Sequence, residues 1–147
     1  MEIVASPANS QLDYVVRTRA SVLKAEKREA ALLEGYTEWL RVRGRKLSAA
    51  KYGAHRCDGI ELVNGEQNSA NLVEAKCSAR REYIRMAVGQ LLDYEFQGRE
   101  LFVDSYKAIL LPEKPPGEII EWLNSIHIKV VWQSGNAFVD NDNGRFT

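Results

Sequence analysis

An acidic and a basic side chain, Glu74 and Lys76, lie two residues apart in residues 71–77 (Asn-Leu-Val-Glu-Ala-Lys-Cys), a segment predicted to be an otherwise buried strand. Side chains alternate between the faces of a strand, so Glu74 and Lys76 would share one face. Asp58 begins the preceding apolar segment, and the Asn-Gly turn dipeptide at residues 64–65 predicts a hairpin between the two segments. That hairpin would place Asp58 beside Glu74. The predicted site therefore combines two carboxylates and an ammonium group.

This set of groups suits phosphoryl-transfer chemistry. Hard cations such as Mg²⁺ prefer carboxylate oxygens and retain several of their waters. The metal stabilises charge that develops on the phosphate and lowers the pKa of a bound water, and a neighbouring lysine can orient or help deprotonate that water. The spacing alone leaves a second interpretation open, in which Glu74 and Lys76 form a partly buried salt bridge and Asp58 is a turn residue.

Apolar periodicity predicts the elements that must position these residues. Helices are expected over about residues 20–42, 80–97 and 116–125, and strands over 57–63, 71–77, 106–111 and 128–132, with a short strand within 45–56. Helices and strands in this order predict an α/β fold, a mixed central sheet flanked by helices. The 147 residues fit a single domain, with a core over about 20–133 and a flexible polar C-terminal tail from about 139.

The order of these motifs resembles the PD-(D/E)xK nuclease superfamily. Asp58-Gly59 is followed by Glu74-Ala75-Lys76 on the next strand and then by a helix. Within that helix, Gln90-Leu-Leu-Asp-Tyr94 resembles the QxxxY extension of the RecB-like and lambda-exonuclease-like branches, and residues four apart share a helix face. Cys57 stands where the family name has proline, a position that varies. The resemblance covers roughly residues 29–132 and implies a restriction-endonuclease-like αβββαβ core.

The resemblance also implies roles for individual residues. Asp58 and Glu74 would bind Mg²⁺, for which Mn²⁺ would substitute, together with the backbone carbonyl of Ala75. Lys76 would assist the attacking water. Gln90 and Tyr94 would act at the active site and on the substrate strand, although plain helix packing explains that pair equally well.

A further glutamate is predicted to reach the metal from the first helix. Glu29 lies one turn before the apolar stripe formed by Leu32, Leu33 and Tyr36. Many members of the resembled superfamily carry a first-helix glutamate that faces the metal, so Glu29 is a predicted ligand. The alternative is a frayed, solvated helix end.

Basic residues near the motifs are candidates for phosphate contacts. Arg80, Arg81 and Arg85 lie at or near the start of the helix that follows Lys76, and residues 41–56 carry six Lys or Arg and no Asp or Glu. Such clusters can bind a nucleic-acid backbone, although a solvated surface would have the same composition. The formal net charge of zero counts mildly against a nucleic-acid binder.

These observations predict a Mg-dependent phosphodiesterase, with endonuclease action favoured over exonuclease action and DNA favoured over RNA. A restriction or defence nuclease, or another DNA-processing nuclease, is the first interpretation. The alternatives are a Holliday-junction resolvase, a non-catalytic nucleic-acid-binding module that kept the fold, and an unrelated α/β protein with an accidental motif. A chain of this size has little surface for reading bases, so we expect a homodimer or a separate recognition or motor module.

The chain shows no signal for a membrane or for secretion. No apolar run approaches the length of a transmembrane helix, and residues 1–11 lack a basic segment followed by an apolar core. We therefore expect a cytoplasmic protein without a membrane partner.

Overall fold

The structure is a computed structural model that describes residues 12–63 and 69–147. Its helices are α1 (Leu12–Val42), α2 (Arg81–Gln97) and α3 (Gly117–Ser125), and its strands are β1 (Ser48–Tyr52), β2 (His55–Val63), β3 (Ser69–Ala75), β4 (Ser105–Leu111), β5 (Ile128–Ser134) and β6 (Ala137–Asp140). The chain is an α/β protein, and its first six elements follow the expected order helix-strand-strand-strand-helix-strand.

The six strands form one mixed sheet in the order β1-β2-β3-β4-β5-β6. The β1–β2, β2–β3 and β5–β6 pairs are antiparallel, whereas β3–β4 and β4–β5 are parallel. Each parallel pair is joined by a helix, α2 or α3, as a parallel crossover requires. The predicted hairpin between the strands of Asp58 and Glu74 is confirmed, although its Asn-Gly turn at 64–65 lies outside the described residues.

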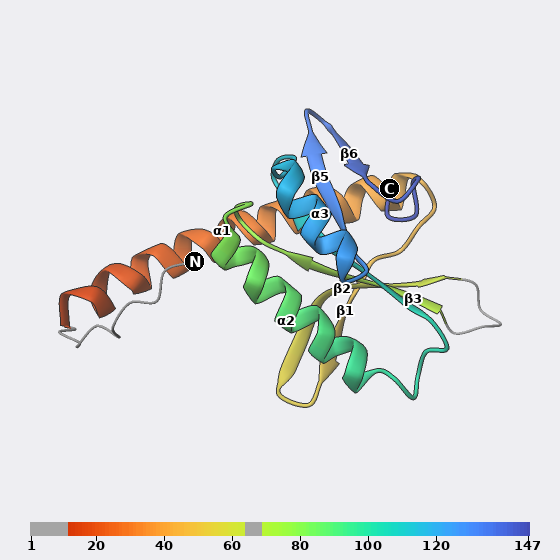
Figure 1. The fold of residues 1–147 in the computed structure, drawn as a ribbon, viewed down its shortest axis with the longest axis horizontal. Coiled ribbons are helices and arrows are strands. Elements are labelled where there is room, and N and C mark those ends of the chain that lie inside the picture. Colours follow the sequence, from red (N-terminus) through yellow and green to blue (C-terminus); the bar gives the residue numbers. More distant parts are fainter. Residues whose placement is uncertain (1–11, 64–68) are drawn as a thin grey trace.

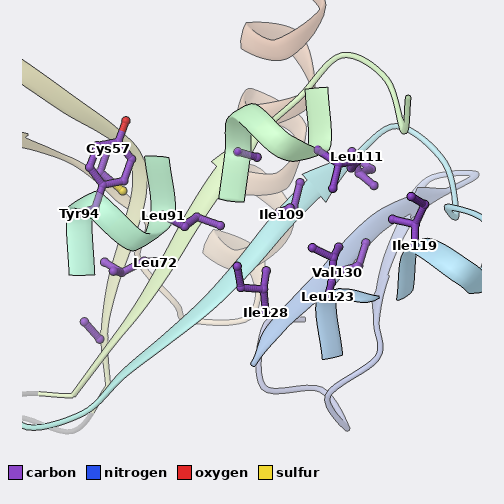
Figure 2. Close-up of a cluster of buried hydrophobic side chains, with 13 residues drawn as sticks. Cys57, Leu72, Leu91, Tyr94, Ile109, Leu111, Ile119, Leu123, Ile128 and Val130 are labelled. Atoms are coloured by element: carbon purple, nitrogen blue, oxygen red, sulfur yellow. The ribbon is translucent and has the colours of Figure 1, made fainter. Parts of the chain in front are cut away.

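Helices cover both faces of the sheet, as Figure 1 shows, with α2 and α3 in front and α1 behind. The core on the α2 and α3 side is drawn in Figure 2 and includes Leu72, Leu91, Ile109, Leu123 and Val130. The core on the α1 side includes Leu32, Tyr36, Val73, Leu110 and Phe138. None of the helices in the described part of the chain has the length and apolar character needed to cross a bilayer.

Strand β3 is buried on both faces, and this determines the environment of the predicted site. Its side chains alternate between the two cores: Leu72 packs on the α2 side, and Val73 and Ala75 pack on the α1 side. Glu74 therefore belongs to a strand with no solvated face. Lys76 follows directly after β3, which ends at Ala75 rather than at the expected residue 77, and both Glu74 and Lys76 are only 3% exposed. Charges in such a position must be paired or bound to another group.

The last eight residues differ from the expected flexible tail. Strand β6 was not predicted, and the chain after it folds back onto α1, where Phe146 is fully buried and its carbonyl accepts a hydrogen bond from Tyr36 Oη at 2.6 Å. The Asp140 carboxylate accepts hydrogen bonds from three backbone N–H groups of this segment and from the Thr147 hydroxyl. The short polar side chains that predicted a flexible tail therefore help to form an ordered turn.

Candidate active site

A β-bulge positions Asp58 at the edge of the site. Ser48 pairs with Ile60 and Ala50 pairs with Cys57, so Asp58 and Gly59 together face the single residue between Ser48 and Ala50. Bulges of this kind bend a strand and redirect its side chains. The Asp58 carboxylate accepts a hydrogen bond from the Ala75 backbone N–H at 3.1 Å. Asp58 thereby continues the β2–β3 hydrogen bonding beyond the last backbone pair.

Gly59 is part of the same local arrangement. A Cβ at this position would lie 2.9 Å from a Leu47 side-chain atom, closer than two carbons normally approach. The bulge was not predicted from the sequence. The Asp-Gly dipeptide inside a strand pattern was the available signal, because an isolated glycine in a strand often marks a bulge or a close approach.

Glu74 and Lys76 form a buried ion pair in which one carboxylate oxygen has no partner. Lys76 Nζ lies 3.3 Å from Glu74 Oε1, and both side chains are 4% exposed. Glu74 Oε2 is buried and accepts no hydrogen bond from the described residues. An acceptor left in this state costs about 1–3 kcal/mol, and more when it is charged. The pair alone does not satisfy Glu74.

The electrostatics of Glu74 point in the same direction. Burial is the main cause that raises its pKa to about 8, and the neighbouring Asp58 carboxylate adds to the effect, while the Lys76 ammonium offsets part of it. A lone Glu–Lys pair would instead favour the ionised carboxylate. When both are ionised, the Asp58 and Glu74 carboxylates carry more negative charge than Lys76 neutralises, and burial favours the protonated form of Glu74.

Glu29 joins the group from helix α1. Its carboxylate accepts a hydrogen bond from the backbone N–H of Cys77, just beyond β3, at 3.2 Å. Burial raises the pKa of Glu29, the charge of Lys76 lowers it, and the charge of Asp58 raises it. The structure thus places Glu29 within electrostatic reach of Asp58 and Lys76, on the helix that covers the opposite face of the sheet from α2.

Gln90 and Tyr94 approach the site from helix α2. Tyr94 Oη donates a hydrogen bond to the Arg56 carbonyl at 2.6 Å, two residues before Asp58. Burial, followed by the charge of Glu74, raises the pKa of Tyr94, and hydrogen bonding to Gln90 lowers it. Gln90 Oε1 is buried and accepts no hydrogen bond from the described residues. Tyr94 lies beside Cys57 at one end of the core, as Figure 2 shows.

The three arginines predicted to contact substrate lie at the start of α2 or just before it. Arg80 pairs with Glu82 at 3.1 Å, and Arg81 pairs with Glu118 at 2.7 Å. Arg85 is exposed. Within the described ranges, none of the three forms a salt bridge with Asp58, Glu74 or Glu29. The three arginines are therefore surface cations near the start of α2, and they do not pair with the carboxylates of the site.

The donor groups fit a hard divalent cation bound with some of its waters. Asp58 and Glu74 supply carboxylate oxygens, and the Ala75 carbonyl lies on the backbone between Glu74 and Lys76. Mg²⁺ is commonly held by only one or two carboxylates, the rest of its shell being water or substrate. Among residues 12–63 and 69–147, no three or more His, Cys, Asp or Glu side chains gather closely enough to hold a metal ion. The fit rests on the unpartnered oxygen of Glu74 and the excess of negative charge.

No protein-family model, no curated protein and no solved structure matches the chain. The functional interpretation therefore depends on the geometry and electrostatics of these residues and on the order of the motifs along the chain.

Proposed function

We propose that this protein is a metal-dependent nuclease that hydrolyses phosphodiester bonds, with DNA as the favoured substrate. One observation carries the proposal: Glu74 is buried with an unpartnered oxygen and a pKa raised to about 8, next to a second carboxylate and a buried lysine. Perturbed, partly unsatisfied titratable groups are typical of catalytic sites. The resemblance of Asp58, Glu74 and Lys76 to the PD-(D/E)xK motif adds the reaction type.

In this proposal Asp58, Glu74 and the Ala75 carbonyl would hold Mg²⁺, and Glu29 would act on it through a water, because the three carboxylates do not gather closely enough in the described residues to bind one ion directly. When bound, the metal would supply Lewis-acid stabilisation of the phosphate and a bound water of lowered pKa. The hydrogen bond from the Ala75 N–H fixes the Asp58 carboxylate against the strand that carries Glu74. A site held by neighbouring strands needs little rearrangement when the substrate arrives.

Lys76 acts on the attacking water. Its ammonium is buried and lies against Glu74 Oε1, so its position is set before substrate binds. A fixed cation can orient the nucleophile and stabilise the negative charge that develops on the phosphate oxygens. Gln90 Oε1, a buried acceptor to which none of the described residues donates, is available to hold a water or a substrate hydrogen from the α2 side.

The test is a cleavage assay with Mg²⁺ or Mn²⁺ on closed circular duplex DNA, linear duplex, single-stranded DNA, a four-way junction and RNA. Lys76→Ala removes the proposed catalytic ammonium. Lys107→Ala is the matched control, because Lys107 is also a buried lysine and pairs with Glu95, but it lies beside Leu72 rather than Glu74. Circular dichroism confirms that each variant is folded.

We expect the protein to cut at least one substrate only when a divalent metal is present. Lys76→Ala should lower the rate by at least about 10²-fold, whereas folded Lys107→Ala should retain it. Nicking of circular DNA would establish endonuclease action, and a preference for the junction would indicate a resolvase. Full activity of a folded Lys76→Ala protein, or binding without cleavage under either metal, would refute the proposal.

A further inference from the structure

Two exposed segments of the molecule adjoin the site, one that precedes Glu29 in α1 and one that precedes Asp58 in the β1–β2 hairpin. In Figure 1 the N-terminal half of α1, drawn in red and orange, runs beyond the sheet, and the β1–β2 hairpin, drawn in yellow, extends in a different direction. Helix α1 reaches the site through Glu29, and the hairpin reaches it through Asp58. We call residues 19–28 the helix arm and residues 51–56 the hairpin arm.

The helix arm is basic and has almost no core of its own. Arg19, Lys24, Lys27 and Arg28 are exposed cations, and Glu26 is the sole acid among residues 19–28. The apolar side chains of the arm are exposed as well, with Val22 at 47% and Leu23 at 59%. Ten residues of helix place these cations over about 15 Å, leading up to Glu29.

The hairpin arm brings like charges together. Lys51 and Arg56 are cross-strand partners in the β1–β2 pairing, and both are exposed. Like charges placed directly opposite each other destabilise a strand pair, unless an anion lies between or near them. The next pair, Ala50 and Cys57, packs toward the α2 core, so alternation turns Lys51 and Arg56 to the other face of the hairpin.

The hairpin arm is held in position despite this repulsion. Tyr94 on α2 donates a hydrogen bond to the Arg56 carbonyl, which fixes the backbone of the arm while leaving its cationic side chain free to reach outward. No acidic residue occurs between Arg41 and Cys57. Among the described residues, no salt bridge involves Lys51, Arg56 or the four cations of the helix arm.

From this placement we propose that the two arms bind the phosphate backbone of a nucleic-acid duplex on either side of the carboxylate site. The inference rests on the proposed nuclease function and names how its substrate is held. A polyanion is the occupant favoured by charge: although the formal charge of the whole chain is zero, the two arms together carry six Lys or Arg residues and a single acid, Glu26. Phosphate contacts of this kind position a duplex without reading its sequence.

The test is the salt dependence of binding, measured in EDTA so that no cleavage occurs. Fluorescence anisotropy follows a labelled DNA duplex of about 20 base pairs between about 50 and 200 mM KCl. Lys51→Ala with Arg56→Ala removes two charges from the hairpin arm, and Lys24→Ala with Arg28→Ala removes two from the helix arm. The matched control is Arg99→Ala with Lys129→Ala, which removes two cations that lie outside both arms and outside the basic residues 41–56.

We expect each arm variant to lower the slope of log K against log salt by about 2 and to raise the Kd at least about tenfold at 100 mM salt. The control should bind within about twofold of the unaltered protein. Equal slopes in all four proteins, absence of duplex binding, or equal arm-dependent binding of polyglutamate would overturn the inference. The metal-dependent cleavage assay tests the nuclease proposal separately. If the protein cleaves and the arm variants bind normally, only the role of the arms is refuted. If binding depends on the arms but no cleavage occurs, only the nuclease function is refuted.

Discussion

Two glutamates are buried in neighbouring strands of the sheet, and they differ in how their charge is satisfied. Glu61 on β2 is 6% exposed and Glu74 on β3 is 3% exposed. Glu61 accepts two hydrogen bonds from the Arg45 guanidinium at 2.7 Å and a third from Asn71 at 3.0 Å. This geometry is a bidentate pair with an additional donor, which is among the strongest arrangements for a buried carboxylate.

Glu74 has the same side chain and similar burial, but its surroundings differ. It has one ammonium partner at 3.3 Å, a second oxygen that accepts no hydrogen bond from residues 12–63 and 69–147, and a neighbouring carboxylate that disfavours its charge. Burial of a carboxylate is therefore no sign of function by itself. What distinguishes Glu74 is an incomplete set of partners, which under the proposed function a cation would complete, whereas Glu61 has a complete set in Arg45 and Asn71.

The largest expected difference is in catalysis. Glu74→Gln removes a proposed metal ligand and should lower the cleavage rate by at least about 10²-fold. Glu61→Gln is chemically the same substitution and should leave the rate of the folded protein within about threefold. The measurement is the initial rate of cleavage of the best substrate of the panel, compared at equal concentrations of folded protein. Similar losses in both variants would show that the two glutamates do not differ in role.

The second prediction concerns pH and metal binding. Because the pKa of Glu74 is about 8, its proton must leave before the carboxylate can bind a cation. Metal affinity should therefore rise with pH, by up to about tenfold per unit between pH 6 and 8, and level off above. Asp58→Asn removes one ligand and also the repulsion that raises the Glu74 pKa, so residual binding should level off at a lower pH.

Isothermal titration with Mn²⁺ at several pH values, in buffers of different ionisation heat, measures both the affinity and the proton release. The metal-free protein offers a second readout. The pKa of Glu74 is raised from 4.5, so the folded state holds a proton that the unfolded state has lost. Its free energy of unfolding should accordingly fall as pH rises from about 5 to 8, and metal should restore it. Metal affinity that is flat between pH 6 and 8 would contradict the prediction.

The third prediction concerns stability. Glu61→Gln removes the anion that accepts two hydrogen bonds from Arg45, a side chain that is 25% exposed. Leaving that guanidinium without its carboxylate should lower the free energy of unfolding by about 2 kcal/mol, measured by urea denaturation. Glu38→Gln is the control, because Glu38 pairs with Arg41 on the exposed surface of α1, and no change in the urea midpoint is expected.

The smallest effect on stability and cleavage is expected for two tyrosines, Tyr94 near Glu74 and Tyr36 near Glu61. Tyr94→Phe removes the hydrogen bond to the Arg56 carbonyl, and Tyr36→Phe removes the bond to the Phe146 carbonyl, both 2.6 Å long. Each should lower the free energy of unfolding by about 1 kcal/mol. Only Tyr94→Phe should also slow cleavage several-fold, since it releases the hairpin next to Asp58. Equal cleavage by the two variants would show that this hydrogen bond is purely structural.

Much of the fold was predictable because the core elements carry clear periodicity. The expected helix over 80–97 corresponds to Arg81–Gln97, and the expected strand over 106–111 corresponds to Ser105–Leu111. Helix α1 begins at Leu12 rather than near residue 20, and its first turns were not predicted because the apolar stripe that indicates the helix lies in its C-terminal half, over residues 32–40. Strand β6 was not predicted because Asp and Asn dominate residues 140–143, and the contacts that Phe138 and Phe146 make with α1 are distant in sequence.

For the candidate site, the sequence alone determined which residues share a strand face, Glu74 with Lys76, and that Asp58 lies on the partner strand. Alternation along a strand is a local property, so it can be read from the order of residues. Only the tertiary structure decided that the strand is covered on both faces, that a bulge brings Asp58 onto the Ala75 N–H, and that Glu29 arrives from the other layer. Burial and charge proximity depend on what packs around a residue, and these contacts produced the raised pKa and the unpartnered oxygen that separate Glu74 from a structural salt bridge.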